Sequence, residues 1–195
     1  MQVKENIFPW ADAGPRWVQI DLDAIMHNVG AVRALLRPET RLLAVVKADA
    51  YGLGAVDVAR AVIDAGADML GVTTVDEGLE LRDKGIEAPI LVFAPFLPGE
   101  AGLAAGNNLT GTVENIDILR DVYAEGGIRG KIHIKLNTGM NRFGMDPGQV
   151  VDCLHLAQAV PGLEVEGIYT HLATTPATNK SFMERQFKVF CETTK

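Results

Sequence analysis

The sequence predicts an α/β fold made of repeated strand–helix units. Short apolar runs alternate with amphipathic helical segments from Leu42 onward, a pattern typical of a parallel sheet with connecting helices. Glycine follows several helical segments, at the position where helices commonly end in a left-handed residue. Successive strands begin roughly 20 to 25 residues apart in most units, as in a TIM barrel. We therefore expect a TIM-barrel-like (β/α) domain that is incomplete, with about six of the usual eight units.

Residues 1–41 form a lead-in before these units. The alternating segment Trp17–Leu22 predicts a strand. Asp23 is expected to cap a helix that ends before Pro38. The apolar positions of this helix recur at helical spacing and are Ile25, Val29, Val32 and Leu36.

The repeated units occupy residues 42–195, and we expect residues 1–195 to form a single domain. The expected strands are 42–47, 69–75, 89–94, 109–113, 131–136 and 165–171. The expected helices are 56–64, 77–84, 99–105, 116–125, 149–160 and 182–191. An open set of strands leaves two unpaired edges. We expect a partner chain, a rearrangement or strand swapping to meet these edges.

Composition limits the possible classes of function. The 195 residues are 48% hydrophobic, which is enough for a sizeable core. The net charge of −7 argues against nucleic acid, which requires a basic face, but not against a small anionic ligand bound locally. Cys153 and Cys191 form no close-spaced motif, as expected for reduced thiols in a cytoplasmic protein. Neither a signal peptide nor an apolar run of ~18 residues is present, so no membrane partner is expected.

A lysine at the end of the first repeated strand is the first candidate for chemistry. Lys47 follows the apolar run Leu42–Val46, where a buried amine is costly to place. An amine withdrawn from water is a good nucleophile toward an aldehyde, which suits a Schiff-base lysine for pyridoxal phosphate. A lysine that only extends its head into solvent is the alternative. Gly52-Leu53-Gly54 does not complete a dinucleotide fingerprint, because Asp57 stands where a third glycine is needed.

The residues around Lys47 resemble a family signature. The segment Ala44-Val45-Val46-Lys47-Ala48-Asp49-Ala50-Tyr51-Gly52-Leu53-Gly54 is similar to the cofactor-lysine motif of bacterial alanine racemases, with Leu53 in place of the usual histidine. The resemblance implies that Lys47 holds pyridoxal phosphate and acts as one of two racemisation bases. It also implies that Tyr51 binds the cofactor phosphate, whereas a packed aromatic side chain is the alternative.

Two later strand ends also resemble this family. Lys135-Leu136-Asn137-Thr138-Gly139-Met140-Asn141-Arg142-Phe143-Gly144 is similar to its Lys-x-Asp-Thr-Gly-Met-x-Arg-x-Gly segment, with Asn137 in place of aspartate. The resemblance implies that Arg142 hydrogen-bonds the phenolic oxygen of the cofactor and helps to recognise the substrate carboxylate. Lys135 matches a lysine that is carbamylated in many members. The alternative is a surface pair of basic residues.

His171 ends the last expected strand and resembles the histidine beside the pyridine ring of the cofactor. A core histidine is the alternative. The other histidines match nothing in the family, and no Cys/His cluster predicts a metal site. These histidines are His27, His133 and His155.

The resemblance implies a pyridoxal-phosphate-dependent isomerase that interconverts L-alanine and D-alanine. In the family a further β domain follows the barrel, so this chain matches only about the first half. The second base is a tyrosine from the C-terminal domain of the other subunit. We therefore expect a homodimer or higher self-association, and little or no activity from this chain alone. A non-catalytic pyridoxal-phosphate barrel, a self-associating scaffold without cofactor, and a racemase for serine or a basic amino acid remain open.

Overall fold

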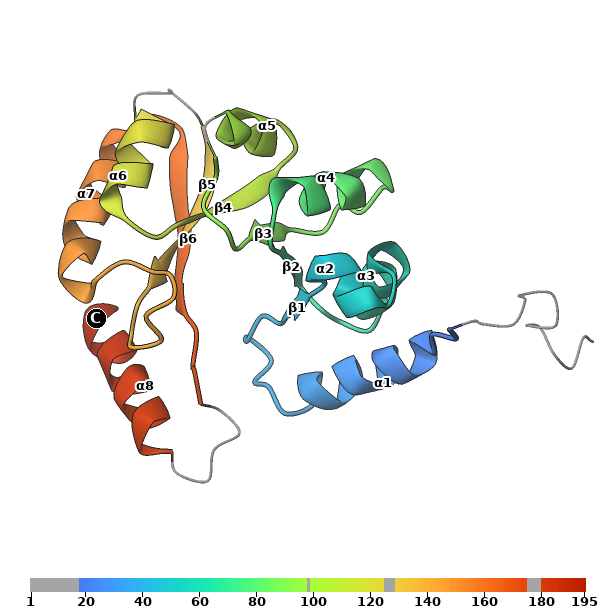
Figure 1. Ribbon diagram of the computed structural model, residues 1–195. Coiled ribbons are helices and arrows are strands. Elements are labelled where there is room, and N and C mark those ends of the chain that lie inside the picture. The colour runs from blue at the N-terminus through green and yellow to red at the C-terminus, as the bar shows by residue number, and fades with distance from the viewer. Residues whose placement is uncertain (1–17, 98, 125–128, 175–179) are drawn as a thin grey trace, which may run out of the picture.

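The computed structural model describes residues 18–97, 99–124, 129–174 and 180–195. Its centre is a six-stranded parallel sheet in which the strands lie side by side in chain order (Figure 1). The strands are β1 (Leu43–Val45), β2 (Met69–Val72), β3 (Ile90–Val92), β4 (Leu109–Val113), β5 (Gly130–Leu136) and β6 (Leu163–Thr170). In the described part of the chain β1 and β6 do not pair with each other, so the sheet stays open. This confirms the predicted incomplete (β/α) barrel.

A helix follows each strand, and these helices lie on the outer side of the sheet, whereas α1 precedes β1 and packs against α3 (Figure 1). The helices are α1 (Leu22–Arg33), α2 (Lys47–Gly52), α3 (Ala55–Asp64), α4 (Val75–Asp83), α5 (Glu100–Gly106), α6 (Ile116–Ile118), α7 (Val150–Ala159) and α8 (Ser181–Thr193). A π-helical segment, η1 (Leu119–Ala124), continues α6, and a 3₁₀ turn, η2 (Pro147–Gln149), precedes α7. The core lies between strands and helices, where Leu70, Ile90, Ile132 and Ile134 are fully buried.

The lead-in differs from its prediction in two ways. Val18–Asp21 has no regular structure and Leu22 already begins α1, so the predicted strand Trp17–Leu22 is wrong for its described residues; Trp17 lies outside them. A strand needs a neighbour to receive its backbone hydrogen bonds, and the described sheet begins at β1. The helix cap is Asp21 rather than Asp23, because the Asp21 carboxylate accepts the N–H of Ala24 at 2.9 Å.

Helix ends were predicted with mixed success. Gly66 and Gly85 adopt positive φ angles of 104° and 80°, as expected for residues that end helices. Gly106, by contrast, is the last residue of α5, and Asn108 after it takes the left-handed conformation, with φ of 53°. Asparagine tolerates this region better than most residues. The first helix ends at Arg33 rather than near Leu36.

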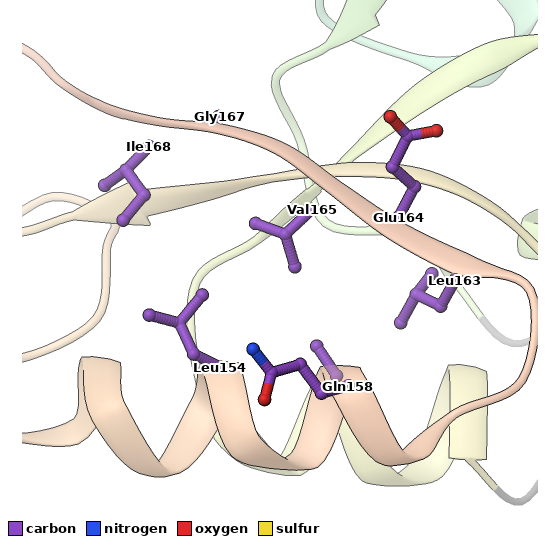
Figure 2. A pocket seen from close by; sticks show the side chains of 8 residues that line it. Leu154, Gln158, Leu163, Glu164, Val165, Gly167 and Ile168 are labelled. Atoms are coloured by element: carbon purple, nitrogen blue, oxygen red, sulfur yellow. The ribbon is translucent and has the colours of Figure 1, made fainter.

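The open edge at β6 is less covered than the centre of the sheet. All residues of β2 are buried, whereas none of β6 is. Figure 2 shows a pocket on the outer side of β6, where Leu154 and Gln158 of α7 face Leu163 and Val165. No residue of this pocket belongs to the candidate site described below. In the described part of the chain, no helix is long and apolar enough to cross a membrane.

Candidate functional site

Lys47 opens a left-handed turn that the sequence did not predict. The four residues Ala48–Tyr51 have φ angles between 51° and 57°. This conformation costs roughly 1–2 kcal/mol per residue for side chains other than glycine. Two carboxylates hold the turn: Glu77 of α4 accepts the N–H of Ala48 at 2.7 Å, and Asp49 accepts the N–H of Ala55 at 2.6 Å. The turn places Lys47 half-buried at the end of β1.

Tyr51 ends the same turn and is 64% exposed. It follows Ala50, which is buried against the core cluster and anchors the turn from inside. The side chain of Tyr51 is therefore largely open to solvent, and its role as a phosphate ligand stays a prediction.

Arg142 lies in the loop that follows β5, and the far end of this loop pairs again with the end of β5. The N–H of Asn137 donates to the carbonyl of Met145 at 2.9 Å, and the N–H of Met145 donates to the carbonyl of Lys135 at 2.8 Å. Gly144 permits this approach, because an added Cβ would lie 2.8 Å from the backbone nitrogen of Asn137. The Asn137 side chain accepts N–H groups of Gly139 and Asn141, each at 3.1 Å. Asn137 thus builds the loop as a turn-forming residue.

Gln186 of α8 joins the loops that follow β5 and β6, and the sequence did not reveal this role. Its side chain is 0% exposed. The amide nitrogen donates to the His171 carbonyl at 3.0 Å and to the Thr138 hydroxyl at 3.1 Å, and the amide oxygen accepts the N–H of Ala173 at 3.0 Å. The available signal was its position midway between Phe182 and Phe190 on the apolar stripe of an amphipathic helix.

Four predicted residues meet at the carboxyl end of the sheet: Lys47, Lys135, Arg142 and His171. Burial lowers the pKa of Lys135, the charges of Arg142 and Lys47 lower it further, and Glu114 opposes them. Burial also lowers the pKa of His171, and the positive charges of Arg142, Lys135 and Lys47 act in the same direction. Like charges disfavour protonation only when they are close. Lys47, Lys135 and Arg142 therefore form a positively charged cluster around His171, opposed by the carboxyl group of Glu114.

Aromatic rings and one carboxylate complete the surroundings of Lys135. Its Nζ lies 5.2 Å from the ring centre of Phe143 and 5.7 Å from that of Tyr169. Burial raises the pKa of Tyr169 to about 12, and its hydroxyl lies 3.1 Å from that of Thr112. Burial likewise raises the pKa of Glu114, whose Oε2 is buried without a hydrogen-bond partner among the described residues.

The remaining histidines and cysteines lie outside this cluster. His133 is half-buried on the inner face of the sheet, and its Nε2 lies 3.7 Å from Oε2 of Glu166. His27 and His155 are exposed on α1 and α7. Both cysteines are free thiols. Among the described residues, no group of three or more metal-ligating side chains comes together.

Comparison with known proteins places this arrangement in a family. The sequence matches the family described as "Alanine racemase, N-terminal domain" over residues 20–195. The chain belongs to the alanine racemase N-terminal domain family. It is 41% identical over 180 residues to an alanine racemase of Desulforamulus reducens, covering 90% of this chain and 49% of that protein. It is 42% identical to the alanine racemase of Geobacillus stearothermophilus, covering 89% of this chain and 46% of that protein.

Solved alanine racemases have the same fold. The crystal structure of alanine racemase from Bacillus anthracis with bound L-Ala-P matches with a TM-score of 0.84 at 37% identity, over 90% of this chain and 46% of that one. The crystal structure of alanine racemase from E. faecalis matches with a TM-score of 0.86 at 32% identity, over 90% of this chain and 48% of that one. The chain therefore spans about half the length of the alanine racemases that it matches.

Proposed function

We propose that this chain is the N-terminal part of an alanine racemase, a pyridoxal-phosphate-dependent isomerase that interconverts L-alanine and D-alanine. The observation that carries the proposal is the meeting of Lys47, Lys135, Arg142 and His171 at one end of the sheet, in a chain of this family. We further propose that residues 1–195 form one cytoplasmic domain that acts within a homodimer. Its ligands are the cofactor and a small amino acid.

The residues present fit pyridoxal phosphate. A phosphate, a phenolate and a substrate carboxylate are all anions, and the charges of Lys47, Lys135 and Arg142 act on one end of the sheet. When bound, the cofactor supplies an electron sink that makes the α-proton of an amino acid acidic. Lys47 is the amine that holds the cofactor aldehyde, and it moves the α-proton on one face of the substrate. Tyr51 donates its hydroxyl to the cofactor phosphate.

Arg142 and His171 orient the ligand from the other side of the cluster. The planar guanidinium of Arg142 can donate two hydrogen bonds, which suits the phenolic oxygen and the substrate carboxylate. The carbonyl of His171 accepts a hydrogen bond from the Gln186 amide, and its ring would lie beside the pyridine ring of the bound cofactor. The lowered pKa of Lys135 increases the fraction of neutral amine, which is the form that reacts with carbon dioxide. We propose carbamylation of Lys135, which would place a negative charge beside Arg142 and fix its orientation.

An absorbance spectrum of the pure chain mixed with pyridoxal phosphate tests the cofactor proposal. We expect a band of the bound cofactor that Lys47→Ala abolishes and Lys188→Ala keeps, since Lys188 is an exposed lysine of α8. A racemase assay on the same sample should show little or no turnover. Family-like turnover would show that the chain needs no second half. Tight binding of pyridoxal phosphate by the monomeric chain would favour a non-catalytic barrel. Self-association of the chain without a cofactor band would favour a scaffold.

A further inference from the structure

Glu77 connects the end of β2, the start of α4 and the turn that begins at Lys47. Its Oε2 accepts the N–H groups of Thr73 at 2.6 Å and Thr74 at 3.2 Å. In return the Thr74 hydroxyl accepts the N–H of Glu77 at 3.3 Å, which completes a capping box. The other oxygen, Oε1, is not needed for the cap and accepts the N–H of Ala48 at 2.7 Å. One carboxylate therefore serves two strand–helix units.

The bond to Ala48 fixes the peptide plane that leaves Lys47. On the other side of Lys47, the N–H of Val46 donates to the Gly71 carbonyl at 2.9 Å, and Val46 is 2% exposed. Lys47 is thus held between a sheet hydrogen bond and a charged acceptor. The left-handed residues that follow would relax to a right-handed conformation if nothing opposed them. Such a change would redirect the Lys47 side chain.

We propose that Glu77 is a positioning residue for Lys47: its second carboxylate oxygen holds the left-handed turn and so aims the Lys47 amine toward Lys135 and His171. This inference rests on the proposed function, in which Lys47 holds the cofactor aldehyde. It assigns to Glu77 a role beyond the capping of α4. The two roles use different oxygens, so they can be separated by substitution.

Glutamine separates them because an amide has only one accepting atom. In Glu77→Gln the one accepting oxygen is expected to stay with the two cap N–H groups of Thr73 and Thr74, which leaves the N–H of Ala48 without its acceptor. Thr74→Ala is the matched control for the cap, because it weakens the capping box and leaves both carboxylate oxygens in place. Glu80→Gln is the control for charge, on an exposed residue of the same helix.

The test labels the lysines of the full chain with pyridoxal phosphate and borohydride, which fixes the aldehyde carbon to whichever amine has condensed with it. Peptide mass spectrometry then gives the labelling ratio of Lys47 to exposed Lys188. We expect Glu77→Gln to lower this ratio about tenfold, the scale of one hydrogen bond to a charged acceptor, while Thr74→Ala and Glu80→Gln keep it. Unfolding would bring the ratio toward one, so each variant is first compared with the wild-type chain by circular dichroism and only folded variants are scored.

Hydrogen exchange of the Ala48 amide, measured by NMR, gives a second readout without cofactor. We expect it to exchange about tenfold faster in Glu77→Gln. If that variant does not fold, Glu77→Asp provides the same test, because it keeps the charge but shortens the reach to Ala48. An unchanged labelling ratio in a folded Glu77 variant would overturn the positioning role. Equal labelling of Lys47 and Lys188 in the wild-type chain would overturn the proposed function itself.

Discussion

The turn after β1 and the loops after β5 and β6 both carry candidate site residues, but they are held by different chemistry. The turn at Lys47 lies near solvent and is held by the carboxylates of Glu77 and Asp49. The loops that carry His171 and Arg142 are joined by one neutral amide, Gln186, which is completely buried. Charged acceptors keep their strength beside water, whereas an amide competes well only where water is excluded. An amide also donates and accepts, so it can join two loops.

The difference in burial predicts the largest effect at Gln186. Gln186→Met keeps the length of the side chain but removes all three hydrogen bonds and leaves the Ala173 N–H and the His171 carbonyl unpaired. We expect the free energy of unfolding to fall by about 3 kcal/mol, measured by urea denaturation. Lys188→Met on the same helix is the control and should change it by less than about 0.5 kcal/mol. A small effect at Gln186 would mean that water replaces the amide.

Substitution of Asp49 tests whether a carboxylate is needed to hold the turn after Lys47. Asp49→Ala removes the acceptor for Ala55 at the start of α3 and places a less tolerant residue at φ of 53°. We expect a loss of about 1–2 kcal/mol in the free energy of unfolding. Asp49→Asn keeps an accepting oxygen and tolerates the left-handed region, so its thermal midpoint should stay near that of the wild type. Equal losses in both variants would show that the charge itself is needed.

Ala48 measures the backbone strain directly. Glycine has no Cβ to clash in a left-handed conformation, so Ala48→Gly should raise the free energy of unfolding by about 1 kcal/mol. The same change at exposed Ala31, in the last turn of α1, should lower it by up to about 1 kcal/mol. Opposite signs in parallel urea titrations would confirm the strained turn. A loss at both positions would contradict it.

The charge of Lys47 in the first region should also change the pKa of His171 in the second, and this effect is the smallest of those predicted. The lowered pKa of His171 means that the unfolded chain takes up its proton first as pH falls, so stability is lost below about pH 6.5. Lys47→Ala removes one of the charges that depress this pKa. The NMR titration of His171 should therefore shift to higher pH in Lys47→Ala and stay unchanged in Lys188→Ala. A midpoint above that of free histidine in the wild type would rule out the positive cluster.

The strands and the site cluster could be predicted because their signals are local. Apolar periodicity located every strand of the sheet, and β4 has the bounds that were predicted, 109–113. Topology then placed Lys47, Lys135, Arg142 and His171 at the same end of the sheet, because parallel strands end on one side.

The turn after Lys47 had no such signal. Its sequence, Ala-Asp-Ala-Tyr, includes only one residue that tolerates the left-handed region well. The stabilising partner, Glu77, lies 29 residues further along the chain. Gln186 was missed for a related reason: a glutamine in an amphipathic helix resembles a surface residue until the loops that it joins are known. Both the left-handed turn and the role of Gln186 depend on contacts between different strand–helix units, which no sequence pattern within one unit reveals.

The chain-ordered strands of the sheet have a consequence for how this protein is made. Every strand pairs with the strand that directly precedes or follows it in sequence. Each pairing therefore closes a connection of a single strand–helix unit, and no pairing between the described strands needs a longer loop. As the polypeptide emerges from the ribosome, each new strand finds its partner already synthesised. The sheet can grow one unit at a time, and the growing edge is always the most recently made strand.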